Sequence, residues 1–257
     1  MLKNLFNKKA IVMPALFLVA IWLGFLLQQI GWIKGCAGAI IPLNLSGLQG
    51  IVFSPFLHGS LEHILGNSIP LLVLSFLLYQ FYPQVANKVM LYGWLFSGLA
   101  VWLTPPFSFF YYEFYTSCII GASGVIYVLA FFLFISGVLR RNLKLLAISL
   151  LVAVYFGSMI WGMIPEELLF SMNEPGRVAW QSHLWGGIIG TVMAFVYQKI
   201  GTRREKFIWE YPNYYSEKDD LMWQEYLQKH PEHFEKFPPT PKEDIWEYLD
   251  ELRRKNP

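Results

Sequence analysis

Residues 119–139, IIGASGVIYVLAFFLFISGVL, form a stretch without a charged side chain. A helix of this length rises about 1.5 Å per residue and therefore reaches across about 30 Å of hydrocarbon. Small and polar residues gather near its start, in the tetrad Gly121-Ala122-Ser123-Gly124. The sequence thus predicts a membrane-spanning helix that carries a serine close to one end.

The rest of residues 1–200 has the same apolar character. The 257-residue chain is 55% hydrophobic and only 15% charged, which is too apolar for an ordinary soluble domain. Apolar stretches occur at six places, approximately Ala10 to Ile33, Leu57 to Tyr82, Val85 to Leu103, Ile119 to Leu139, Leu145 to Ile164 and Val178 to Ile200. We therefore expect an all-α membrane protein with six spans. The first stretch has no convincing cleavage site, so we interpret it as a retained span rather than a signal peptide.

Charged residues between these stretches indicate the orientation. Basic residues gather on one side of the predicted membrane: Lys3, Lys8, Lys9, Lys88, Arg140, Arg141, Lys144 and Lys199. The other side has Lys34 and Arg177 with the acidic residues Glu62, Glu113, Glu166, Glu167 and Glu174. Because positive residues favour the cytoplasmic side, we expect both termini in the cytoplasm. The short N-terminal segment without transit-peptide character favours a bacterial cytoplasmic membrane.

The composition changes near Gly201. Residues 1–200 hold 10 Lys/Arg and 5 Asp/Glu, whereas residues 201–257 hold 10 Lys/Arg and 13 Asp/Glu, so we expect a charged, aromatic cytoplasmic tail. The tail has two short amphipathic segments, Asp220 to Gln228 and Glu243 to Arg254. Whether it docks on the membrane, on a partner or on nothing stays open. No basic stripe suggests a nucleic-acid partner, and the oligomeric state is not predicted.

Four polar groups on three predicted spans share one depth. Ser123 is 17 residues, and His183 is 16 residues, from the basic residue at the cytoplasmic end of its span. Both therefore lie roughly 5 Å below the outer edge of the hydrocarbon. Asn67 falls at the same level, and His63 lies one turn higher on the same helix face. Since polar groups within spans are costly, this layer predicts a functional site near the outer face.

Ser123 and His183 have the chemistry of a nucleophile and its base. A serine hydroxyl is a weak nucleophile until a neighbouring base takes its proton, and neutral imidazole suits that role. Residues 1–200 contain no Asp, so we predict a dyad without an acidic third member and exclude a paired-aspartate protease. No His-Glu-x-x-His occurs, which argues against a zinc protease. We expect no metal or cofactor, and a metal bound by the three membrane histidines is the less favoured alternative.

The surroundings of Ser123 fit acyl transfer. Gly121 and Gly124 let backbone approach Ser123 closely, and the Ser123 N–H near a helix N-terminus can face a developing oxyanion. The side chains of Asn67 and His63 are further candidate donors to that oxyanion.

The predicted helix that carries His183 has glycines at the spacing of a helix-packing face. Gly186 and Gly190 remove side-chain bulk, so another helix can come close and bring His183 toward Ser123. Ordinary helix packing explains the same glycines equally well. Tyr127, one turn beyond Ser123, either covers the imidazole or fills the core.

Three segments together resemble the rhomboid intramembrane serine proteases: HGSLEHILGN (His58–Asn67), GASGVIY (Gly121–Tyr127) and HLWGGIIG (His183–Gly190). The resemblance covers roughly residues 50–195. It implies that Ser123 is the nucleophile, that His183 is the general base and later the acid, and that Asn67, His63 and the Ser123 backbone form the oxyanion site. It also implies that Tyr127 packs on His183, that His58 is structural, and that the substrates are transmembrane segments of other proteins in the bilayer.

Two other functions remain open. A non-proteolytic relative would bind membrane proteins and assist their trafficking or degradation, with Ser123 and His183 dispensable. A transporter or channel is less favoured because the polar layer is shallow and one-sided, and because we find no internal repeat.

The two cysteines, Cys36 and Cys118, are too few for a disulfide framework, and we expect two buried thiols, while whether the two pair stays open. The first outer loop, residues 34–56, contains neither Trp nor Arg. It therefore lacks the Trp-Arg pair common there in rhomboids, which leaves open how this loop is braced.

Overall fold

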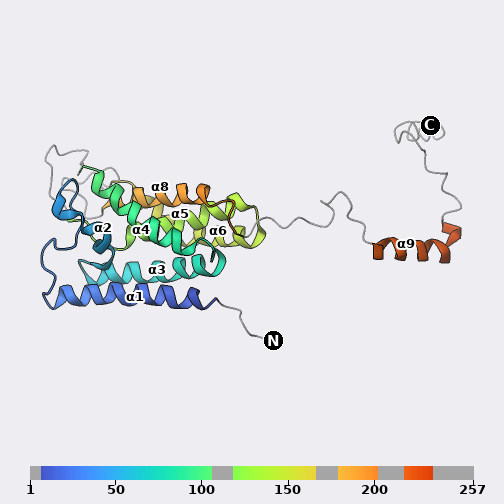
Figure 1. Ribbon diagram of the computed structural model, residues 1–257, viewed down its shortest axis with the longest axis horizontal. Helices are drawn as coiled ribbons and strands as arrows, with labels where there is room; N and C mark the ends of the chain where they lie inside the picture. Colours follow the sequence, from blue (N-terminus) through green and yellow to red (C-terminus); the bar gives the residue numbers. More distant parts are fainter. Residues whose placement is uncertain (1–6, 106–117, 166–178, 202–216, 234–257) are drawn as a thin grey trace. The chain divides into compact units, whose positions relative to one another are not determined.

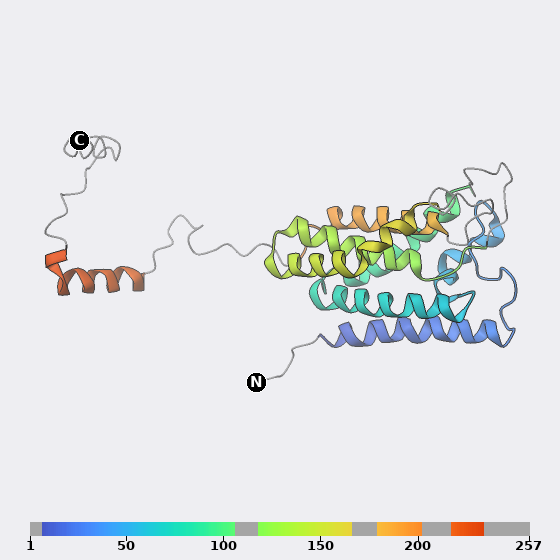
Figure 2. The same ribbon diagram turned by 180° about the vertical axis from the view of Figure 1, so that it is seen from behind.

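The computed structural model describes residues 7–105, 118–165, 179–201 and 217–233. Two compact units divide the chain, Met1–Arg204 and Glu205–Pro257. In the first unit six helices run side by side (Figure 1; Figure 2): α1 (Lys8–Gln29), α3 (Leu61–Phe81), α4 (Ala86–Leu103), α5 (Ser123–Arg140), α6 (Leu143–Phe156) and α8 (Trp180–Val196). Shorter turns connect them: η1 (Leu45–Gly47), α2 (Gly50–Phe53), η2 (Ser54–Phe56) and η3 (Gly157–Met163), which continues α6.

Four helical stretches of the described residues are long and apolar enough to cross a membrane: Lys8–Gln29, Leu61–Phe81, Ser123–Arg140 and Leu143–Met163. These correspond to four of the six stretches expected from the sequence. The other two stretches form α4, with 18 residues, and α8, with 17 residues, in the same bundle. The first residue of the sixth expected span, Val178, lies outside the described residues, as do Lys3, Arg177 and the outer acidic residues Glu113, Glu166, Glu167 and Glu174.

Helix α5 lies at the centre of the bundle, where it contacts α3, α4, α6 and α8. Its inner side chains, such as Phe132 and Leu133, are fully buried. Helix α8 approaches α5 down to the backbone, because a Cβ atom added at Gly190 would overlap the carbonyl group of Val128. The glycines of α8 thus allow the close packing on the serine helix that their spacing suggested.

Arg140 ties together the ends of α3, α5 and α8 that lie farthest from Ser123. Its buried guanidinium donates hydrogen bonds to Ser136 Oγ at 3.0 Å, to the Tyr197 carbonyl oxygen at 2.9 Å and to the Ile200 carbonyl oxygen. It also lies 4.9 Å from the centre of the Tyr82 ring at the end of α3. Because Tyr197 and Ile200 directly follow α8, Arg140 fixes the register of α8 against α5 and satisfies carbonyl groups that a helix end leaves free.

The two cysteines form a disulfide, Cys36–Cys118, with 5.5 Å between their Cα atoms. The expectation of two buried thiols is therefore wrong, and Cys36 is in fact exposed. Apolar composition around each cysteine does not reveal that the fold brings them together at the end of the bundle where Ser123 lies. The bond braces the first outer loop.

In the second unit, α9 (Glu217–Lys229) includes the first amphipathic segment expected in the tail, and η5 (Pro231–His233) follows it. Lys229 donates to Glu225 one turn away, an exposed pair that adds little to helix stability. The second amphipathic segment, Glu243 to Arg254, lies outside the described residues.

Candidate active site

Ser123 is the first residue of α5 and is partly accessible. The chain enters the helix through Gly121, whose φ of +114° is strained for any residue with a side chain. Gly121 is held in place by donating its N–H to the Ser54 carbonyl oxygen at 2.9 Å. Because the first N–H groups of a helix have no partner within it, the backbone N–H of Ser123 is oriented to meet negative charge.

His63 and Asn67 lie against the turn that leads to Ser123. A Cβ atom added at Gly121 would lie 2.7 Å from His63 Nε2 and 3.7 Å from Asn67 Nδ2. Asn67 is buried, and its side-chain nitrogen has no hydrogen-bond partner among the described residues. Two side-chain donors from α3 therefore lie at the same turn as the N-terminus of α5.

The imidazole of His183 is held on two sides. Its ring stacks on the Tyr127 ring, with 4.3 Å between the ring centres and 8° between the planes. Its Nδ1 atom lies 2.8 Å from the carbonyl oxygen of Gly162. A carbonyl oxygen only accepts hydrogen bonds, so Nδ1 carries a proton. In the neutral ring Nε2 is then unprotonated, which is the form a general base needs. Of the two roles considered for Tyr127, the stack corresponds to covering the imidazole.

The carbonyl of Gly162 occupies the position that a carboxylate has in a three-residue catalytic site. Gly162 belongs to η3, and the neighbouring Met159 carbonyl accepts a hydrogen bond from the Tyr127 hydroxyl. The segment after α6 therefore holds both rings of the stack. A Cβ atom at Gly162 would overlap the Tyr127 hydroxyl and lie 3.1 Å from His183 Nδ1, so glycine is required for this contact. Sequence analysis missed Gly162 because the contact uses only backbone.

The sequence neighbours of Ser123 and His183 touch one another. A Cβ atom at Gly124 would lie 2.7 Å from the Ser182 hydroxyl, and one at Gly186 would overlap the Gly124 carbonyl oxygen. The start of α5 and the start of α8 are thus in backbone-level contact. The structure brings the serine turn and the His183–Tyr127 stack together at one end of the bundle.

His58 lies behind this site rather than in it. It is 1% exposed, and its ring meets that of His63 edge to face at 4.9 Å between centres. Its backbone N–H donates to the side-chain oxygen of Gln28 in α1 at 2.8 Å. His58 therefore supports the orientation of His63. Within the described part of the chain, no group of three His, Cys, Asp or Glu residues could hold a metal ion.

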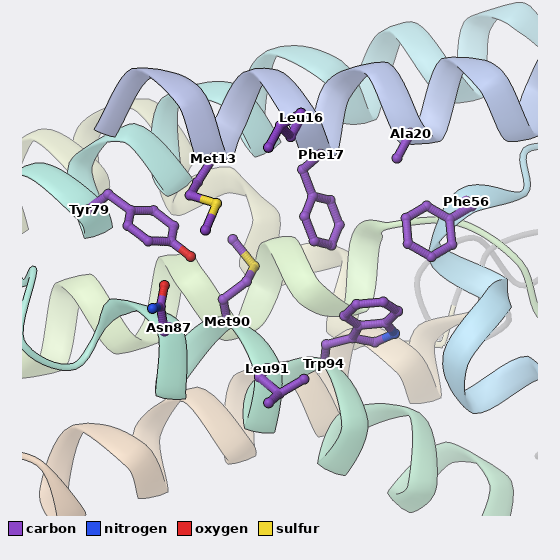
Figure 3. A pocket seen from close by; sticks show the side chains of 10 residues that line it. All are labelled: Met13, Leu16, Phe17, Ala20, Phe56, Tyr79, Asn87, Met90, Leu91 and Trp94. Carbon is purple, nitrogen blue, oxygen red and sulfur yellow. The ribbon is translucent and has the colours of Figure 1, made fainter. Parts of the chain in front are cut away.

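An apolar pocket lies elsewhere on the bundle, between α1, α3 and α4 (Figure 3). Its lining residues are Met13, Leu16, Phe17, Ala20, Phe56, Tyr79, Asn87, Met90, Leu91 and Trp94. None of them belongs to the candidate site, and their surface is almost entirely apolar. This pocket is therefore separate from the candidate active site.

Comparison with known proteins finds the same family that the three sequence segments resemble. The rhomboid domain model matches residues 45–200, more than half of the chain. Uncharacterized proteins of Mycobacterium tuberculosis and Mycobacterium bovis are each 31% identical over 184 residues, which cover 70% of this chain and 72% of theirs. One of Mycobacterium leprae is 34% identical over 155 residues, covering 60% of this chain and 58% of its own. The chain belongs to the rhomboid family, a family of intramembrane serine proteases.

Proposed function

We propose that this protein is an intramembrane serine endopeptidase that hydrolyses peptide bonds in or near transmembrane segments of other membrane proteins. The observation that carries the proposal is the His183 imidazole, stacked on Tyr127 and bonded through Nδ1 to the Gly162 carbonyl, on a helix packed against the start of α5. This arrangement supports a general base that uses Nε2 to take the proton of Ser123, and it needs no acidic residue.

In the proposed reaction the Ser123 hydroxyl attacks the scissile carbonyl carbon while His183 Nε2 takes its proton. The negative charge that develops on the carbonyl oxygen is met by the Ser123 N–H, by Asn67 Nδ2 and by the ring N–H of His63. His183 then gives the proton to the leaving amine, and the acyl group stays on Ser123. A water molecule, deprotonated by His183 in turn, releases the second product.

We also propose that residues 1–200 cross the membrane six times, with both termini in the cytoplasm and residues 201–257 as a cytoplasmic tail. The site then lies near the outer face of a bacterial cytoplasmic membrane, in lipid and within reach of water. The Cys36–Cys118 disulfide supports this orientation, because disulfides persist on the oxidising side of that membrane.

The direct test is active-site labelling of the purified protein together with cleavage of a transmembrane substrate. We expect a fluorophosphonate to modify one residue, Ser123, as located by peptide mass spectrometry, and to block cleavage. Labelling at a different serine, or cleavage that continues in fully labelled protein, would contradict the proposal and favour a function for which Ser123 is dispensable.

Gly162→Ala is expected to lower kcat about 10²-fold, since displacing a catalytic group by about 1 Å costs about that much. The added methyl would overlap the Tyr127 hydroxyl and crowd His183 Nδ1. The matched control is Gly157→Ala in the same segment, where an added Cβ has nothing within 4 Å. Measured by single-turnover cleavage, equal rates for the two variants would show that the Gly162 contact does not position the base.

A further inference from the structure

The first outer loop holds the short segment that leads into Ser123. Cys118, five residues before the serine, is joined to Cys36 by the disulfide. Ile119 and Ile40 then form an antiparallel bridge, with N–H to carbonyl distances of 2.9 and 3.0 Å. The Gly121 N–H also donates a hydrogen bond to the Ser54 carbonyl oxygen. These contacts hold Cys118, Ile119 and Gly121 to the loop.

This segment determines where the catalytic groups lie. Gly121 has a backbone conformation that favours glycine, and a Cβ atom added there would meet His63 and Asn67. A shift of the segment would therefore move Ser123 and its backbone N–H relative to two of the proposed oxyanion donors. Displacements of this kind affect the chemical step more than substrate binding.

Residues 34–37, beside the disulfide, are weakly anchored, whereas Leu43 donates its N–H to the Trp102 carbonyl oxygen of α4 and Trp102 Nε1 donates to the Asn44 carbonyl oxygen, each at 2.9 Å. Ile40 and Ile119 pack with Val101 in a small cluster that is separate from the main core of the bundle. Residues 34–37 are exposed, and Gly35 and Gly38 have positive φ values that leave this stretch without regular structure. The disulfide thus adds a covalent constraint to the backbone hydrogen bonds through which the loop holds the serine turn. Since Cys36 is exposed, a small dithiol can reach it.

We propose that the Cys36–Cys118 disulfide is a positioning element for the catalytic turn, so that protease activity depends on its oxidation state. The inference rests on the proposed function. A dithiol reduces the bond by thiol–disulfide exchange: its thiolate attacks one sulfur and displaces the other as a thiolate. The second thiol of the reagent then releases the protein as two free thiols and becomes a cyclic disulfide itself. In the reduced protein the serine turn loses its covalent anchor.

The experiment compares oxidised and dithiothreitol-treated full-length protein, with free thiols counted in each sample. We expect reduction to lower kcat and the rate of fluorophosphonate labelling about 10-fold, with KM nearly unchanged, because the turn and not the substrate-binding surface is disturbed. Removal of the reductant and reoxidation should restore both rates. The Cys36→Ala/Cys118→Ala variant should have the lowered kcat from the start and should not respond to dithiothreitol.

The outcomes separate this inference from the proposed function. If the oxidised protein neither cleaves nor labels, the proposed function fails. If it does both and neither reduction nor the double substitution changes kcat or the labelling rate, only the positioning role is overturned. A loss of activity that disappears at a temperature well below the unfolding midpoint of the reduced protein also overturns it, because the bond would then serve stability alone. The dithiothreitol measurement decides the question even if the double variant does not fold.

Discussion

Ser123→Ala is expected to lower kcat by about 10⁶-fold, the loss found when the nucleophile of a serine protease is removed, and to abolish fluorophosphonate labelling. The fold should persist. Alanine is the best helix former, Ser123 stands at the first position of α5, and this helix start has no side-chain cap to lose. The measurement is single-turnover cleavage of a transmembrane substrate, accompanied by thermal unfolding of the same samples.

Ser136→Ala is the matched control on the same helix. Ser136 is fully buried and accepts a hydrogen bond from Arg140 at 3.0 Å, so its loss should cost about 1 to 3 kcal/mol of stability while labelling at Ser123 continues. Ser123→Ala should therefore abolish labelling and leave stability unchanged, whereas Ser136→Ala should lower stability and leave labelling unchanged. Cleavage that survives Ser123→Ala in a correctly folded protein would refute the acyl-enzyme mechanism and support the non-proteolytic alternative.

The helices could be predicted because hydrocarbon excludes charged side chains and unpaired backbone groups. The shared depth of the polar residues stays a prediction, although His63 and Asn67 do lie against the turn before Ser123. The span expected at Ile119 to Leu139 ends within one residue of α5, at the basic residue Arg140. Its beginning was less predictable. The sequence stays apolar through Ile119, but the chain there forms a bridge with Ile40 and turns at Gly121, so the helix begins only at Ser123.

Other contacts leave no pattern in the sequence. Every residue has a carbonyl group, so a search for acidic partners of His183 could not find Gly162. The disulfide joins cysteines 82 residues apart, and their pairing depends on how the outer loop folds over the bundle. Arg140 was expected only as a charge of a cytoplasmic loop, whereas its guanidinium is buried between helix ends. Backbone acceptors and long-range pairing are thus properties of the tertiary structure alone.

His183→Ala is expected to lower kcat about 10⁴-fold, the upper range for loss of a general base, and to slow fluorophosphonate labelling, because the Ser123 hydroxyl then keeps its proton. The expectation differs for His63→Ala, which removes one proposed oxyanion donor and should cost about 10² to 10³-fold while the dependence on a titrating base remains. His230→Ala, in the second unit and outside the proposed catalytic residues, is the control for histidine loss and should leave the rates unchanged. If His183→Ala retains cleavage within about 10-fold of the unsubstituted protein, another group must be the base, and the contact between His183 Nδ1 and Gly162 then has a purely structural role.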